Sequence, residues 1–283
     1  EVNDVSSLIT IQEGQRDIQP LYLVHGIGGG LMWAYRNLAK HLNSAQPVHA
    51  FSSRGHAGLT EYSTPRDMAV AYVEEMRKHQ RDGPYALGGY CFGGNVAYEM
   101  ARVLEEEGEA VNLLLIIDAY PYYAERCQKG LQLHSWTEGG RFLANLYHKT
   151  VALGSLGNKD RWEHLQRMRR WVRVRMSRHP STMDDEVATL TNVANYSSSH
   201  NSGSAVLMRT SAQPIFSCFQ EDLGWSKLIG GGIEIIRFKG HHDALFLEPL
   251  VYETAKEVER LLAQRKPRVI RSISLTHRSP RAN

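Results

Sequence analysis

The sequence predicts an α/β fold, built on a mostly parallel sheet with helices on both faces. Two observations support this prediction. Short aliphatic runs alternate along the chain with stretches in which apolar residues recur every three or four positions, and strands that alternate with helices are typical of parallel sheets. One run, Val111–Ile117, is almost continuously apolar, as expected of a strand buried on both faces.

The remaining elements follow from the same patterns. We expect strands at 21–25, 48–51, 85–87, 111–117, 205–209, 215–219 and 233–238. We expect helices over 33–42, 68–80, 96–104 and 251–264, where apolar residues repeat at helical spacing.

Between about residues 120 and 203 this alternation stops. The segment has helical patterns but no clear strand, so we expect a helical lid inserted after the strand that ends at Ile117. Residues 1–264 then form a single domain that carries this lid. The tail, 265–283, is basic and rich in serine and arginine, and we expect it to be disordered.

Composition narrows the class of protein. The net charge is only +3, and no basic motif is interleaved with aromatic residues, so we expect no nucleic-acid partner. No apolar run approaches the length of a membrane span, and no signal-peptide pattern is present. Three cysteines without paired or metal-ligand spacing favour the reducing cytoplasm over a disulfide framework. Because the chain begins with Glu1 instead of Met, we expect it to be part of something longer.

The most informative motif is G-x-C-x-G-G at residues 89–94. Between a predicted strand and a predicted helix, it is typical of a nucleophile elbow. Small neighbours let strand and helix approach closely, while the turn holds its central residue, Cys91, in a strained conformation. The following helix directs its N-terminus at Cys91, which favours a thiolate. A buried cysteine is more commonly an inert core residue, but this context favours a nucleophile.

A cysteine nucleophile needs a general base, and the base needs a third group to orient it. Among 13 histidines, His242 is favoured because it follows the strand predicted at 233–238, and catalytic groups gather at the carboxyl edge of a parallel sheet. Its neighbour His241 is the competing candidate. For the orienting carboxylate, Asp118 comes directly at a strand end, and Asp222 is the alternative.

Negative charge that develops on the substrate oxygen requires two backbone N–H donors, each contributing on the order of 3 kcal/mol. Phe92, directly after the nucleophile, is the natural first donor. The best candidate for the second is Ile27, in the glycine-rich loop after the first predicted strand. This loop lacks the G-x-G-x-x-G register of a dinucleotide site, so we expect no bound cofactor. Because the cysteines lack metal-ligand spacing, we also expect no metal.

Together these motifs resemble the thioesterase domains that end nonribosomal peptide and polyketide synthases. The resemblance covers 20–262, and it is carried by L-V-H-G at 23–26, the elbow segment at 83–94, V-A-Y-E-M-A at 96–101, L-I-I-D-A-Y-P at 115–121, G-W at 224–225 and G-H-H at 240–242. It implies an α/β-hydrolase fold with a helical lid. It also implies a triad formed by Cys91, Asp118 and His242, in that chain order.

The resemblance implies a function as well. The family takes an acyl or peptidyl chain from the phosphopantetheine arm of an upstream carrier protein and releases it by cyclisation or hydrolysis. Carrier proteins are acidic, so a basic lid helix that includes Arg167 and Arg170 is a candidate docking element. The commonest family pattern has serine at the elbow, whereas Cys91 keeps the chain as an activated thioester. We therefore expect a demanding second nucleophile, such as an amine that forms a macrolactam or a hydroxyl that closes a strained lactone.

Other interpretations of these motifs remain open. Cys91 could be an introduced replacement of serine that slows the acyl-enzyme. A stand-alone editing thioesterase would carry the same motifs. Enzymes that resemble dienelactone hydrolases share G-Y-C-x-G-G and would use Asp222 as the acid, although the insertion at 120–203 argues against them. A binding or scaffold module would require a broken triad.

Overall fold

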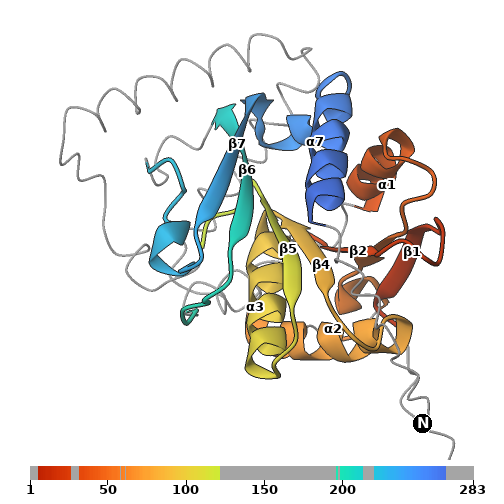
Figure 1. The fold of residues 1–283 in the computed structure, drawn as a ribbon, viewed down its shortest axis with the longest axis vertical. Helices are drawn as coiled ribbons and strands as arrows, with labels where there is room; N and C mark the ends of the chain where they lie inside the picture. Colours follow the sequence, from red (N-terminus) through yellow and green to blue (C-terminus); the bar gives the residue numbers. More distant parts are fainter. Residues whose placement is uncertain are drawn as a thin grey trace, which may run out of the picture.

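A mostly parallel sheet forms the centre of the computed structural model, which describes residues 6–26, 32–57, 59–60, 62–121, 196, 198–212 and 220–265. Seven strands lie in the order β1-β3-β2-β4-β5-β6-β7 (Figure 1). Their bounds are β1 Leu8–Gln12, β2 Leu21–Val24, β3 Val48–Phe51, β4 Tyr85–Tyr90, β5 Val111–Ile117, β6 Ala205–Ala212 and β7 Ile233–His241. Within this sheet β1 pairs with β3 in antiparallel fashion, and the other neighbours are parallel. The predicted α/β class is confirmed.

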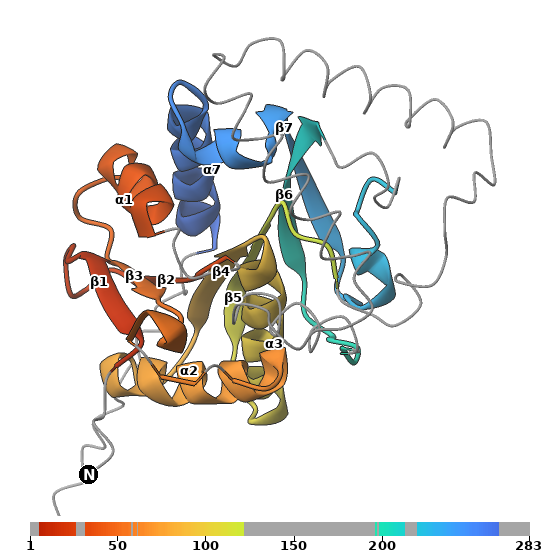
Figure 2. The same cartoon turned by 180° about the vertical axis from the view of Figure 1, so that it is seen from behind.

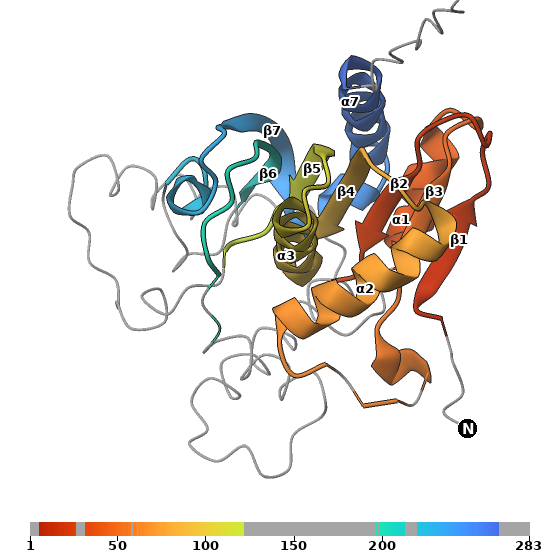
Figure 3. The same cartoon turned by 60° about the horizontal axis from the view of Figure 1, so that its bottom comes forward.

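Among the described residues, four α-helices cover the two faces of the sheet (Figures 2 and 3). They are α1 Met32–His41, α2 Pro65–His79, α3 Phe92–Glu106 and α7 Leu250–Gln264. The core under α2 and α3 takes Leu114 and Ile116 from β5, whereas the core under α1 and α7 takes Leu115 and Ile117. Successive side chains of a strand point to opposite faces, so the apolar run of β5 fills both cores.

Local sequence signals explain where α2 begins. The hydroxyl of Thr64 accepts a 3.1 Å hydrogen bond from the backbone N–H of Asp67, and Pro65 occupies the first helical position. Threonine is a favoured N-cap, and proline fits the first turn because its missing N–H is not needed there.

The structure extends several predicted elements, and the extension of the last strand bears on the site. The strand expected to end at Phe238 continues to His241, because Phe238 pairs with Thr210 and His241 pairs with Ala212 on the long strand β6. His242 consequently begins a short 3-10 helix, His242–Phe246, instead of lying in an irregular loop.

Other predictions fall partly or wholly outside the described residues. These include the strand at 215–219, nearly all of the lid at 120–203 with its basic helix, and the tail beyond residue 265. Among the helices that are described, none is both long and apolar enough to cross a membrane.

Candidate active site

Cys91 occupies a sharp turn between the end of β4 and the start of α3. Its backbone has φ 55° and ψ −121°, a left-handed region that residues other than glycine rarely adopt and that costs about 1–3 kcal/mol. Two hydrogen bonds fix this turn: the N–H of Cys91 donates to the carbonyl of Ile117 at 3.0 Å, and the N–H of Gly94 donates to the carbonyl of Cys91 at 3.1 Å. The geometry is that of the predicted elbow.

Glycines let three elements meet at this turn. A Cβ atom on Gly93 would overlap the carbonyl oxygen of Val24 at the end of β2. A Cβ atom on Gly89 would overlap the carbonyl oxygen of Gly93. Because both neighbours are backbone atoms, no side-chain rotation could relieve these overlaps. The two glycines therefore allow α3 to start directly against β2 and β4.

Asp118 lies at the end of β5, next to the elbow, and is only 2 % exposed. Its Oδ1 accepts a 2.8 Å hydrogen bond from the backbone N–H of Thr210, and its Oδ2 accepts a 2.8 Å bond from the hydroxyl of the same residue. A buried carboxylate needs such donors to offset lost hydration. Sequence reasoning missed Thr210, whose only signal was a hydroxyl near the end of an apolar strand.

His242 completes the cluster from the end of β7. Its Nδ1 lies 2.7 Å from Oδ2 of Asp118. Burial lowers the pKa of His242, but hydrogen bonds with Asp118 and Cys91, together with the charges of these groups, outweigh burial and hold the pKa well above its ordinary value. The structure thus brings Cys91, Asp118 and His242 together at the carboxyl edge of the sheet.

Asp222, the alternative acid, is engaged elsewhere. Its carboxylate accepts hydrogen bonds from the backbone N–H groups of Gly224, at 3.1 Å, and Ser226, at 2.8 Å. Burial raises the pKa of Asp222, but these hydrogen bonds outweigh it and lower the pKa overall. The side chain therefore caps the turn into the 3-10 helix Trp225–Lys227, while His242 pairs with Asp118.

Comparison with known proteins gives the family. The family model described as a thioesterase domain matches residues 19–259 of this chain. The chain belongs to the thioesterase domain family. A solved structure of the NocB thioesterase domain shares 24% sequence identity, with a TM-score of 0.60 over 90% of this chain and 99% of that one. The sheet and its helices are thus an α/β-hydrolase fold, as the resemblance implied.

Relatives of the thioesterase domain are parts of large synthetases. Malpibaldin synthetase of Mortierella alpina is 39% identical over 144 residues, which are 50% of this chain and 2% of that protein. A dimodular nonribosomal peptide synthase of Bacillus subtilis is 41% identical over 106 residues, 37% of this chain and 4% of that protein. A structure of holo-AB3403, a four-domain nonribosomal peptide synthetase, is 28% identical with a TM-score of 0.63, covering 90% of this chain and 20% of that chain. The chain thus spans a small share of these relatives.

Of the two candidate oxyanion donors of the thioesterase domain, Phe92 lies within the described residues and Ile27 does not. Phe92 is the first residue of α3 and is buried. Two residues before Ile27, His25 is described. Its Nδ1 is 2.7 Å from the carbonyl of Gly26, and its Nε2 is 3.1 Å from the hydroxyl of Tyr72. These contacts anchor the start of the glycine-rich loop.

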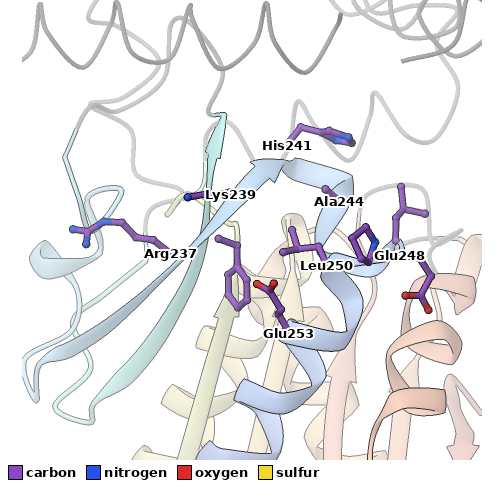
Figure 4. Close-up of a pocket in the computed structure, with 10 residues that line it drawn as sticks. Arg237, Lys239, His241, Ala244, Glu248, Leu250 and Glu253 are labelled. Atoms are coloured by element: carbon purple, nitrogen blue, oxygen red, sulfur yellow. The ribbon is translucent and has the colours of Figure 1, made fainter. Parts of the chain in front are cut away.

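A cleft of about 640 Å³ lies beside the site, between the end of β7 and the start of α7 (Figure 4). Arg237, Lys239 and His241 lie along β7, and Leu250 and Glu253 belong to the first turn of α7. None of the three clustered residues lines this cleft, whereas His241, the competing base, does. In the described part of the chain, no group of three or more histidine, cysteine or acidic side chains could hold a metal ion.

Proposed function

We propose that this domain accepts an acyl or peptidyl chain from the phosphopantetheine thioester of a carrier protein onto Sγ of Cys91, and then releases it by cyclisation or hydrolysis. One observation carries the proposal: Nδ1 of His242 lies 2.7 Å from Oδ2 of Asp118, and interaction with Cys91 helps to raise the pKa of the same imidazole. That is the arrangement in which a histidine can move a proton to and from a nucleophile while a carboxylate holds its ring.

The acylation step follows from this arrangement. Because Nδ1 of His242 is engaged with Asp118, Nε2 is the ring nitrogen left to take the proton of Sγ. The thiolate of Cys91 attacks the thioester carbonyl, and negative charge collects on the carbonyl oxygen. The tetrahedral intermediate then collapses: the bond to the pantetheine sulfur breaks, and His242 returns the proton to that leaving thiol.

In the release step, Sγ of Cys91 becomes the leaving group. His242 takes a proton from the second nucleophile, which is water, an amine or a hydroxyl of the chain itself. This nucleophile attacks the acyl carbon, the bond to Sγ breaks, and the thiolate of Cys91 recovers its proton. Acyl transfer from one thioester to another is nearly isoenergetic, so the chain on Cys91 stays activated. We therefore favour cyclisation with a weak or constrained nucleophile over simple hydrolysis.

The partner in this proposal is an upstream carrier domain. Support comes from the relatives, which include a dimodular nonribosomal peptide synthase and a four-domain nonribosomal peptide synthetase. No separate cofactor is required, because the phosphopantetheine arm brings the substrate as a thioester.

Intact-protein mass spectrometry tests this proposal. The protein is mixed with an acyl thioester of N-acetylcysteamine and quenched at short times. We expect a mass gain equal to one acyl group, located on Cys91 by peptide mapping and absent from Cys91→Ala. A cognate carrier-bound chain then separates the two release modes, because hydrolysis adds the mass of water to the product and cyclisation does not. A wild-type protein that never acquires the acyl group contradicts the proposal.

A further inference from the structure

Tyr90, the residue before Cys91 in the elbow, contacts the segment that carries the proposed base at two points. Its ring stacks on the imidazole of His242, with ring centroids 4.4 Å apart and planes inclined by 29°. Its hydroxyl donates a 2.9 Å hydrogen bond to Oδ1 of Asp243. The strand that presents the nucleophile therefore also holds consecutive residues of the histidine segment.

We propose that Tyr90 is a positioning residue: it fixes the imidazole of His242 opposite Cys91 and stabilises the protonated ring, with Asp243 as the anchor of its hydroxyl. This inference rests on the proposed function, because it takes His242 as the base. It adds a role for the residue before the nucleophile and for the carboxylate that follows the histidine.

The surroundings of Tyr90 hold its ring in one orientation. The side chain is 1 % exposed. Phe246 packs edge-on against it, with centroids 5.0 Å apart and planes inclined by 83°, and Phe246 makes a similar edge contact with Tyr35 at 5.8 Å. The backbone N–H of Tyr90 donates to the hydroxyl of Tyr35 at 3.1 Å. A ring enclosed in this way can transmit the position of β4 to the histidine that it touches.

The stacking contact also has an electrostatic effect. The face of an aromatic ring carries partial negative charge, so it attracts a cation that lies against it. His242 becomes such a cation whenever it holds the proton of Sγ. Burial and the charge of Asp243 raise the pKa of Tyr90, so its hydroxyl stays protonated and able to donate.

Different groups act on different parts of the imidazole. Asp118, directly after β5, contacts Nδ1 at the ring edge, and Cys91 in the elbow helps to raise the pKa of the ring. Tyr90 lies against the face of the ring, and Asp243 holds the hydroxyl of Tyr90. Loss of Tyr90 should therefore make the protonated form of the imidazole less stable without removing its hydrogen bond to Asp118.

Alkylation of Cys91 by iodoacetamide measures this effect without any acyl substrate. The rate at Cys91 is followed by peptide mass spectrometry from pH 4 to 10 in the wild type and in Tyr90→Leu. A less stable imidazolium makes the thiolate harder to form, so we expect the midpoint to rise by about 0.5–1 pH unit. Tyr90→Phe keeps the stacked ring and should shift the midpoint by less than half as much. A midpoint in Tyr90→Leu within about 0.2 units of wild type overturns the stacking role.

A double-mutant cycle tests the anchor. Tyr90→Phe and Asp243→Ala remove opposite ends of one hydrogen bond, so with the N-acetylcysteamine thioester we expect each to lower kcat about fivefold at unchanged KM. The double variant should lose no more than either single variant. Additive losses overturn the anchor. These variants keep the ring or leave Tyr90 intact, so they test the proposal even if Tyr90→Leu does not fold.

Tyr85→Phe is the matched control. Tyr85 is a buried tyrosine on the same strand, and its hydroxyl donates to the carbonyl of Arg81 at 2.8 Å, at the opposite end of β4. We expect unchanged kcat and an unchanged alkylation midpoint; equal losses in Tyr85→Phe and Tyr90→Phe contradict a positioning role. The two proposals fail separately: a wild type that forms no acyl adduct refutes the proposed function, whereas an adduct with no change in any Tyr90 variant refutes only this inference.

Discussion

Replacing Asp118 with asparagine tests the assignment of the acid most directly. The carboxylate accepts hydrogen bonds from the backbone N–H and the hydroxyl of Thr210 and from Nδ1 of His242. Asparagine keeps one oxygen for the N–H of Thr210 but turns an NH₂ group towards the imidazole. His242 can meet a donor only with an unprotonated Nδ1, which places its proton on Nε2. That nitrogen could then no longer take the proton of Cys91.

The size of the effect follows from what is lost. The charge-assisted hydrogen bond contributes about 1.5–3 kcal/mol, and the wrong tautomer must be reversed before every reaction. Together we expect about 4 kcal/mol at the barrier, which is about a thousandfold in rate. The same kind of substitution in a serine triad lowers kcat about 10⁴-fold, and a thiol, being more acidic than a hydroxyl, depends less on its base.

Quenched-flow acylation of Cys91 by an N-acetylcysteamine thioester at pH 7 measures this loss. The deficit of Asp118→Asn should shrink at high pH, where hydroxide deprotonates a thiol without help from a base. Asp222→Asn is the matched control and should acylate within a factor of two or three of the wild type. If Asp118→Asn stays within tenfold of the wild-type rate, or if Asp222→Asn is the slower variant, the reasoning from geometry is refuted.

Three further predictions concern the fold and the choice of sulfur. Gly93→Ala should lower the free energy of unfolding by about 2–4 kcal/mol in urea titrations, because its Cβ meets the carbonyl of Val24; a loss under 1 kcal/mol would contradict that close approach. Asp222→Ala should cost about 0.5–1 kcal/mol at pH 7 as a lost cap. Because the folded pKa of Asp222 is lowered, this contribution is present above the unfolded pKa and disappears as the pH falls through the folded one; a loss that grows towards pH 3 would refute it. Cys91→Ser should still accept the chain but release a cyclic product about tenfold more slowly, since an oxygen ester is less activated; much faster turnover of the serine form would refute the role proposed for sulfur.

Elements with a strong apolar pattern could be predicted closely. The bounds of β5 agree at both ends, because six of its seven residues are apolar and the run stands out clearly from its flanks. β1, Leu8–Gln12, was not predicted. Its residues are partly or fully exposed, and it pairs on one side with β3, so its five residues carry no distinctive apolar run.

The clustered residues of the site could be predicted for a different reason. Cys91, Asp118 and His242 each follow a strand directly, and parallel strands end at the same edge of a sheet. Their supporting contacts could not. Thr210 meets Asp118 across 92 positions only because β6 pairs with β5 in one particular register. The contact of Tyr90 with Asp243 likewise depends on how the 3-10 helix packs, which no local pattern specifies.

Backbone strain at two adjacent strand ends ties these observations together. Cys91 and Asp118 both have positive φ, at 55° and 46°, and the residues before them, Tyr90 and Ile117, are paired across β4 and β5. Each strained residue still donates its N–H to the next strand, to Ile117 and to Met208. The ladder therefore extends one residue past each strand before the chain turns, which brings both side chains to the same edge. Substitutions that relax either turn should raise the stability of the fold. They should also lower the rate of acyl transfer, because the strained turns align the side chains of Cys91 and Asp118.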